Sequence, residues 1–216
     1  MDIATMLELL GKGALVSLEI FFVTMVGSLI LGLLLCLVRM SKFVVFRLLA
    51  KFYISVMRGT PLMLQLFVVY FGPYYIFNVN ISPSYKLMAV FIGFVLNYAA
   101  YFAEIYRAGI ESIPIGQYEA AKLLGYGRVQ TFFYIIMPQV VKRIIPPVTN
   151  ETITLVKDTS LAFTLAVAEM FTIAKQIAAA DRKVTAFVLA GIMYYVFNLL
   201  VAGAFAKLEK KLSYYR

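Results

Sequence analysis

The sequence predicts an all-α integral membrane protein with about five transmembrane helices. The chain is 62% hydrophobic and only 14% charged, whereas about 25% of the residues of an ordinary soluble domain are charged. Uncharged runs recur along the chain, and several are as long as the roughly 20 residues that a helix needs to cross a hydrocarbon core of about 30 Å. The basic residues gather between these runs. We therefore expect a single membrane domain over residues 1–216.

The first two spans are expected at residues 14–38 and 60–77. The first run contains a single charged residue, Glu19, and ends before Arg39. The second is uncharged and barely long enough, and we expect Gly72 and Pro73 to disrupt its helix near the far end.

The other three spans are expected at residues 87–103, 144–168 and 184–206. The run at 144–168 is the least apolar, because it contains Glu151, Lys157 and Asp158. Its length nevertheless suits a span.

The distribution of Lys and Arg predicts the orientation. Cytoplasmic segments carry an excess of these residues. With the N-terminus outside and the C-terminus in the cytoplasm, 14 of the 20 Lys and Arg residues lie on the cytoplasmic side and five on the outer side. The net charge of +9 therefore reflects topology, and we expect the lipid bilayer, not nucleic acid, as the surrounding partner.

The residue inventory excludes several kinds of site. There is no His, and Cys36 is the single cysteine, so His-based metal sites, His triads and internal disulfides are not expected. No phosphate-binding Gly-x-x-x-x-Gly-Lys-Ser/Thr loop occurs. We expect no catalytic or metal-binding residues, and no removable signal peptide because the first 12 residues lack a basic n-region.

Residues 107–143 are predicted to form a cytoplasmic segment with its own helices. Pro114 suits a helix start, and Gly125 with Gly127 suits a helix stop. A second helical piece is expected over residues 128–137, ended by Pro138.

This segment carries the motif that identifies a family. Glu119-Ala120-Ala121, Gly125 and Ile136-Met137-Pro138 resemble the signature loop of bacterial ABC importer permeases. Four further phrases look like the polar amino-acid (His/Gln/Arg-type) branch of these permeases, and the resemblance runs from about residue 17 to about residue 174. Those phrases are Arg58-Gly59-Thr60-Pro61, residues 103–107, residues 112–117 and Lys157-Asp158-Thr159-Ser160-Leu161.

The resemblance implies a function and a set of partners. In such permeases the short cytoplasmic helix couples the spans to a separate ABC ATPase subunit, which holds ATP and Mg²⁺; no cofactor is then expected in this chain. It also implies a second permease copy, for which we expect a homodimer, an external solute-binding protein and a multi-pass location in the bacterial inner membrane. The residues expected to couple to the ATPase are Gln117, Glu119, Ala120, Ala121, Leu124 and Gly125.

The charges in the fourth span form the second candidate site. A charged side chain inside the membrane is costly and should face the bundle interior or a cavity. Glu151 and Asp158 are seven residues apart, so they lie within about 20° of each other around a helix. One interpretation is an ion pair of Lys157 with Asp158 or Glu151 that steadies the helix.

The other interpretation is a polar substrate cavity. Two acids and a single lysine leave a net negative site, which favours a cationic amino acid such as arginine. Thr159 and Ser160 would suit the carboxylate end of the substrate. The candidate substrate residues are Asn97, Tyr98, Tyr101, Glu151, Thr154, Asp158, Thr159, Ser160 and Leu161.

Two further motifs are expected to have structural roles, and two other functions are considered as alternatives. Arg58-Gly59-Thr60-Pro61 is interpreted as mainly architectural, at the start of the second span, and the spacing of Ser28 and Gly32 suits close helix packing. The alternatives are a self-contained ion-coupled transporter or channel using Glu151 and Asp158, and a membrane subunit without a pathway. ATP dependence and association with an ATPase separate these hypotheses.

Overall fold

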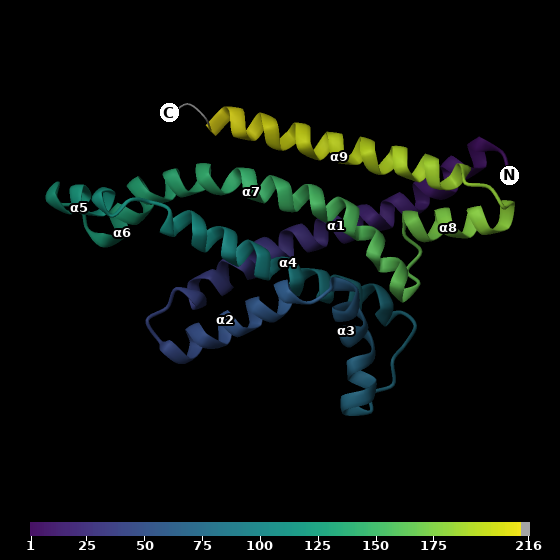
Figure 1. Ribbon diagram of the computed structural model, residues 1–216, viewed down its shortest axis with the longest axis horizontal. Coiled ribbons are helices and arrows are strands. Elements are labelled where there is room, and N and C mark those ends of the chain that lie inside the picture. Colours follow the sequence, from purple (N-terminus) through teal and green to yellow (C-terminus); the bar gives the residue numbers. More distant parts are fainter. Residues whose placement is uncertain (213–216) are drawn as a thin grey trace.

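The computed structural model describes residues 1–212, which contain helices and no strands. Four long helices run along the long axis of the molecule (Figure 1): α1 (Ile3–Arg39), α4 (Tyr85–Glu111), α7 (Met137–Asp158) and α9 (Thr185–Leu212). The N-terminus lies at one end of this axis, and the short helix α5 (Ile115–Leu123) lies at the other.

Two of the predicted spans are bent pairs of helices. Helix α2 (Val44–Gly59) meets α3 (Leu62–Phe77) at 112°, and the continuous helical rod Arg128–Leu165 meets α8 (Met170–Asp181) at 59°. By length and composition, three helices of the described chain can cross a membrane, and five spans result if each bent pair is one span. The prediction of an all-α membrane protein with about five spans is confirmed.

The single-helix spans are longer than the uncharged runs suggested. Helix α1 begins at Ile3 instead of residue 14, α4 continues past residue 103 to Glu111, and α9 continues past residue 206 to Leu212. In α4 the added charges neutralise one another, because Arg107 forms ion pairs with both Glu104 and Glu111. The end of an uncharged run is therefore not the end of a helix.

The second predicted span differs most. Residues 58–61 form the bend between α2 and α3: Arg58 and Gly59 end the 16-residue helix α2, and Thr60 and Pro61 precede α3. Gly72 and Pro73 do not disrupt the helix, which continues to Phe77 and is capped by Asn78 at φ 53°. Pro73 has no N–H to donate to the Val69 carbonyl, and the hydroxyl of Tyr85 donates to that carbonyl instead, at 3.4 Å.

The fourth predicted span is a composite. The predicted helix over residues 128–137 is present, but Pro138 does not end it. Helix α6 (Arg128–Gln130) passes through a π-helical turn (Thr131–Ile136) into α7, and Pro138 lies directly after this turn, inside the continuous rod. After Asp158 the helix tightens to a 3-10 segment (Thr159–Leu165) that ends at Ala166 in the left-handed region.

Helix α4 is the centre of the packed core. Its buried side chains include Phe94, Tyr98 and Phe102, and they contact residues of α1, α3 and α7. The predicted close packing at Ser28 and Gly32 is confirmed: both are buried, and a Cβ at Gly32 would lie 2.8 Å from Cβ of Phe102. The small residues of α1 thus let its backbone approach α4.

Candidate functional site

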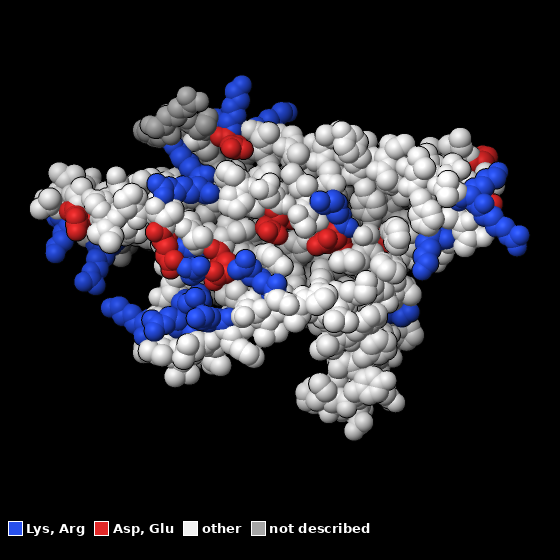
Figure 2. Space-filling model, viewed as in Figure 1, with Lys and Arg blue, Asp and Glu red and all other residues white. Residues whose placement is uncertain are grey.

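A cavity of about 620 Å³ lies between α4 and α7. Tyr101 lines it from α4, Glu151 from α7 and Arg58 from the end of α2. Figure 2 shows acidic and basic side chains gathered in a band on this face of the molecule, between α7 and α2, with further charged groups at the two ends of the long axis. The remaining lining residues are Glu104, Ile105, Arg107, Ala108, Gly109, Ser112, Arg143 and Pro147.

Glu151 is the acid of this cavity without a counter-ion. Its side chain is partly buried, and no Lys or Arg nitrogen in residues 1–212 lies within ion-pair distance of its carboxylate. Removing a carboxylate from water is expensive unless a cation or hydrogen-bond donors compensate. Three arginines, Arg58, Arg107 and Arg143, line the same cavity, but none of them lies within ion-pair distance of Glu151.

Asp158 is held in place from the neighbouring helix. The hydroxyl of Tyr98, a residue only 2% exposed, donates a 2.7 Å hydrogen bond to Oδ2 of Asp158. Tyr98 lies one turn before Tyr101 on α4, with 6.1 Å between the ring centroids. The two acids of α7 thus face the same stripe of tyrosines, Asp158 opposite Tyr98 and Glu151 in the cavity with Tyr101.

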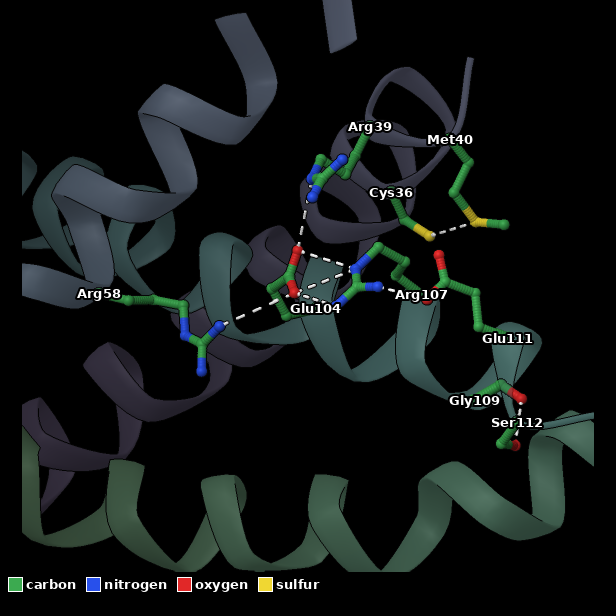
Figure 3. Close-up of polar contacts among 9 residues, drawn as sticks. All are labelled: Cys36, Arg39, Met40, Arg58, Glu104, Arg107, Gly109, Glu111 and Ser112. Carbon is green, nitrogen blue, oxygen red and sulfur yellow. Dashed lines mark hydrogen bonds and ion pairs between the residues drawn. The ribbon is translucent and has the colours of Figure 1, made fainter. Parts of the chain in front are cut away.

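A second charge cluster borders the cavity (Figure 3). Glu104 of α4 accepts hydrogen bonds from Nε and Nη2 of Arg107, the shortest at 2.6 Å, and lies 3.7 Å from Nε of Arg39 and 4.0 Å from Nη1 of Arg58. Arg107 also pairs with Glu111. This cluster, formed by Glu104, Arg39, Arg58 and Arg107, ties the ends of α1 and α2 to α4.

The side-chain amides of Gln65 and Asn97 stabilise the bend between α2 and α3. Gln65 donates to the carbonyls of Met57 and Thr60, at 3.0 and 3.1 Å, and to the Thr60 hydroxyl, at 2.8 Å. Asn97 of α4 donates to the Met57 carbonyl at 3.0 Å and to Oε1 of Gln65 at 2.9 Å. Carbonyls left free by the break in the helix are thereby satisfied, and the backbone at the end of α2 is fixed relative to α4.

The short helix α5 lies at the far end of the molecule from the N-terminus (Figure 1). Gly125 follows it with φ +79°, the Tyr126 N–H bonds to the Ala121 carbonyl, and the Gly125 N–H bonds to the Lys122 carbonyl. These two bonds make a Schellman motif, which favours glycine at the left-handed position. The predicted helix start at Pro114 and stop at Gly125 are both confirmed.

One side of this segment is an exposed apolar surface. Ala121 is buried against the rest of the chain, but Leu123 is 89% exposed and Leu124 is 76% exposed. Ile115, Val129 and Tyr134 are also more than two-thirds exposed. Apolar side chains this exposed on a rigid, capped element are suited to binding another protein.

Comparisons with known proteins identify the family. Residues 24–214 match the model of the binding-protein-dependent transport system inner membrane component. The chain belongs to this family. It is the membrane component of an ABC transporter and is not itself the ATP-hydrolysing subunit.

Relatives of the chain include permeases of amino-acid ABC transporters. The chain is 40% identical to the probable amino-acid ABC transporter permease protein YckA of Bacillus subtilis, over 94% of this chain and 89% of YckA. It is 38% identical to the arginine transport system permease protein ArtQ of the same organism, over 94% and 91% of the two chains. The crystal structure of an amino acid ABC transporter with histidines superposes with a TM-score of 0.87 and 30% identity, covering 98% and 99% of the two chains. The predicted resemblance to amino-acid ABC permeases and the multi-pass inner-membrane location are confirmed.

The structure brings together some of the predicted substrate residues of this permease. Tyr98 contacts Asp158, and Tyr101 shares the cavity with Glu151. Asn97 is instead 4% exposed and bonded to the α2–α3 bend.

The hydroxyl-bearing candidates bond to their own helix. Thr154 bonds to the Asn150 carbonyl, the fully buried Thr159 to the Val156 carbonyl, and Ser160 to the Lys157 carbonyl. Leu161 packs against the hydrophobic core. The predicted substrate-binding roles of these four residues stay predictions.

The predicted ion pair of Lys157 is not formed. Within the described part of the chain, the Lys157 ammonium makes no ion pair with Asp158 or Glu151, and the residue is exposed. Lys157 is about 100° around the helix from Asp158, on the side away from Tyr98. The partner of Asp158 is therefore Tyr98 of a neighbouring helix and not the adjacent Lys157.

Glu104, Arg107, Glu111 and Gln65 make contacts around the site but are not among the residues predicted for it. The spacing of Glu104, Arg107 and Glu111 at three and four residues is a signal for helical ion pairs that was available. The sequence around Gln65 contains no such signal, and Arg58 was predicted to have a mainly architectural role. Their positions depend on contacts between helices that no local pattern contains.

Proposed function

We propose that the chain forms the translocation path for polar amino acids, with a preference for cationic ones such as arginine, and binds them on the α4–α7 face. One observation carries the proposal: the cavity contains the partly buried carboxylate of Glu151 without a counter-ion in the described chain. Asp158, held by Tyr98, adds a second acid two turns along α7. An ammonium or guanidinium group would supply the missing positive charge.

The opposite end of the molecule supports the coupling role. We place α5 and the C-terminus of α9 in the cytoplasm and the N-terminus outside, as the distribution of basic residues favours. The exposed Leu123 and Leu124 would enter a groove of an ABC ATPase subunit, with Gln117, Glu119 and Ala120 also on the exposed surface of α5. That subunit would bind ATP and Mg²⁺, and an external solute-binding protein would deliver the substrate at the N-terminal end.

A second copy of the chain is proposed as the other half of the pathway. The cavity is open on the face shown in Figure 2, so one chain does not enclose it. Each chain carries its own Glu151, Asp158 and coupling helix. A homodimer therefore has a complete set of these residues in each half.

The test is uptake by proteoliposomes that contain this permease with its ATPase. Arginine, histidine, lysine, glutamine and glutamate are compared in the presence and absence of ATP. We expect ATP-dependent uptake, with cationic amino acids preferred. Uptake that needs no ATP and follows a sodium or proton gradient would replace the proposal with the ion-coupled transporter.

Glu151→Gln tests the site itself. We expect this variant to reduce arginine uptake about tenfold or more and glutamine uptake much less, because only arginine loses an ionic partner. Glu19→Gln is the matched control, since Glu19 is an exposed acid within α1. An equal loss for arginine and glutamine would show that Glu151 has a structural role.

A further inference from the structure

Arg58 is one of three arginines that line the cavity of Glu151, together with Arg107 and Arg143. Arg107 is paired with Glu104 and Glu111, and Arg143 donates to the Ser112 carbonyl. Arg58 projects from the last turn of α2, and its side chain and that of Glu151 line the space between α4 and α7. Figure 3 shows its guanidinium extended from α2 toward Glu104 on α4, in the space above α7. The sequence predicted a mainly architectural role for Arg58, whereas its side chain lines the candidate cavity.

Arg58 is the most loosely held arginine of its cluster. Nη1 of Arg58 lies 4.0 Å from Glu104, compared with 2.6 Å for Nη2 of Arg107 and 3.7 Å for Nε of Arg39. Its side chain is 45% exposed, whereas those of Arg39 and Arg107 are 20% and 25% exposed. Its other contact is with the face of Tyr101, 5.3 Å from the ring centroid, and such a cation–π contact at a partly exposed site is weak.

Glu104 does not depend on Arg58 for its charge balance. Arg107 donates three hydrogen bonds to the Glu104 carboxylate, and Arg39 lies on the other side. The Arg58 guanidinium can therefore move away from Glu104 without leaving that carboxylate unpaired. Glu151, in the same cavity, has no cation of its own in residues 1–212.

We infer that Arg58 is a specificity-determining residue: its guanidinium competes with the cationic group of the substrate for the negative field of Glu151. When Glu104 and Tyr101 hold Arg58, Glu151 is free to bind a cation. When Arg58 turns toward Glu151, it neutralises the site and repels a cationic substrate. This inference rests on the proposed function, since it assigns a regulator to the proposed site.

The competition has a direction that can be measured. Two positive groups beside one carboxylate repel each other, and this repulsion weakens as salt screens it. Loss of the Arg58 charge should strengthen binding of a cationic amino acid by about three- to tenfold at low salt. Binding of a neutral amino acid should change by less than about twofold, because its side chain carries no charge to be repelled.

The experiment measures binding of arginine and glutamine to the purified permease–ATPase complex, for the wild type, Arg58→Gln and Arg58→Lys. Arg47→Gln is the matched control: Arg47 is an exposed arginine of the same helix and does not line the cavity. We expect tighter arginine binding only in Arg58→Gln. Combining it with Glu151→Gln should abolish the gain.

The outcomes separate this inference from the proposed function. Weaker arginine binding in Arg58→Gln, or an equal change for arginine and glutamine, would overturn the role of Arg58. If Arg58→Gln does not assemble, Arg58→Lys decides: it keeps the charge, so its ratio of arginine to glutamine affinity should match the wild type, and a changed ratio refutes the inference. A wild-type complex that binds neither amino acid would instead refute the proposed function.

Discussion

The hydroxyl of Tyr98 on α4 donates a 2.7 Å hydrogen bond to Oδ2 of Asp158 at the end of α7. The helix changes from α to 3-10 immediately after Asp158. The bond thus fixes a carboxylate, and the point where the helix tightens, relative to the central helix of the core. Hydrogen bonds to charged groups contribute roughly 1.5–3 kcal/mol.

Tyr98→Phe removes this bond and little else. We expect arginine binding to the permease–ATPase complex to weaken about tenfold, because Asp158 loses the donor that orients it and tenfold in affinity corresponds to about 1.4 kcal/mol. The midpoint of thermal unfolding should fall as well. Tyr74→Phe is the control, since Tyr74 is 48% exposed; unchanged binding in Tyr98→Phe would mean that the hydrogen bond has no part in the site.

The ion pairs of Glu104 are expected to contribute substantially to the free energy of unfolding. Glu104→Gln leaves three arginines close together, with a neutral amide in place of the carboxylate. We expect a loss of about 2 kcal/mol, less than the 3–5 kcal/mol of a fully buried pair because the cluster is partly exposed. Thermal unfolding of the complex in detergent measures it.

The control for Glu104 is the same substitution at an exposed pair. Glu8 pairs with Lys12 at 2.8 Å, and both side chains are about two-thirds exposed. Glu8→Gln should leave the midpoint of thermal unfolding nearly unchanged, because an ion pair between exposed side chains adds little stability. Equal effects of the two substitutions would show that the Glu104 cluster adds no more stability than a surface pair.

Gln65 is predicted to hold the bend between α2 and α3. Gln65→Leu removes the two amide N–H donors that the Met57 carbonyl, the Thr60 carbonyl and the Thr60 hydroxyl share, and the acceptor of the Asn97 amide. We expect a lower midpoint of thermal unfolding and reduced transport, since Arg58 and α3 lose their fixed relation. Gln176→Leu, at an exposed position of α8, should change neither; equal behaviour of the two variants would contradict the assigned role.

Gly125 is predicted to act through its backbone conformation. Its φ of +79° is unfavourable for side chains branched at Cβ, but the space around an added Cβ is open. Gly125→Val should therefore disorder the end of α5 and reduce co-purification of the ATPase and transport. Gly125→Asn should retain most of both, because asparagine tolerates the left-handed region. An equal loss of ATPase co-purification and transport in both variants would indicate that the partner packs directly against Gly125, where any side chain would interfere.

The sequence by itself determined the fold class, the number of spans and the position of the short helix α5. These features depend on local properties: the length of uncharged runs, the turn-forming residues around Pro114 and Gly125, and a motif of contiguous residues. It also placed Glu151 and Asp158 on one face of a helix, because helical periodicity relates residues seven apart. Helix ends were less accurate, since the runs ended at charges that ion pairs neutralise in the folded chain.

Only the tertiary structure decided which side chains meet. Lys157 is adjacent to Asp158 in sequence, yet Tyr98, 60 residues away, is its partner. Residues 58–61 form a bend instead of a helix start because Gln65 and Asn97 bind the carbonyls there, and the bend carries Arg58 into the cavity of Glu151. The physical reason is the same in each case: a polar group removed from water must find a partner, and packing of the helices determines which one is within reach.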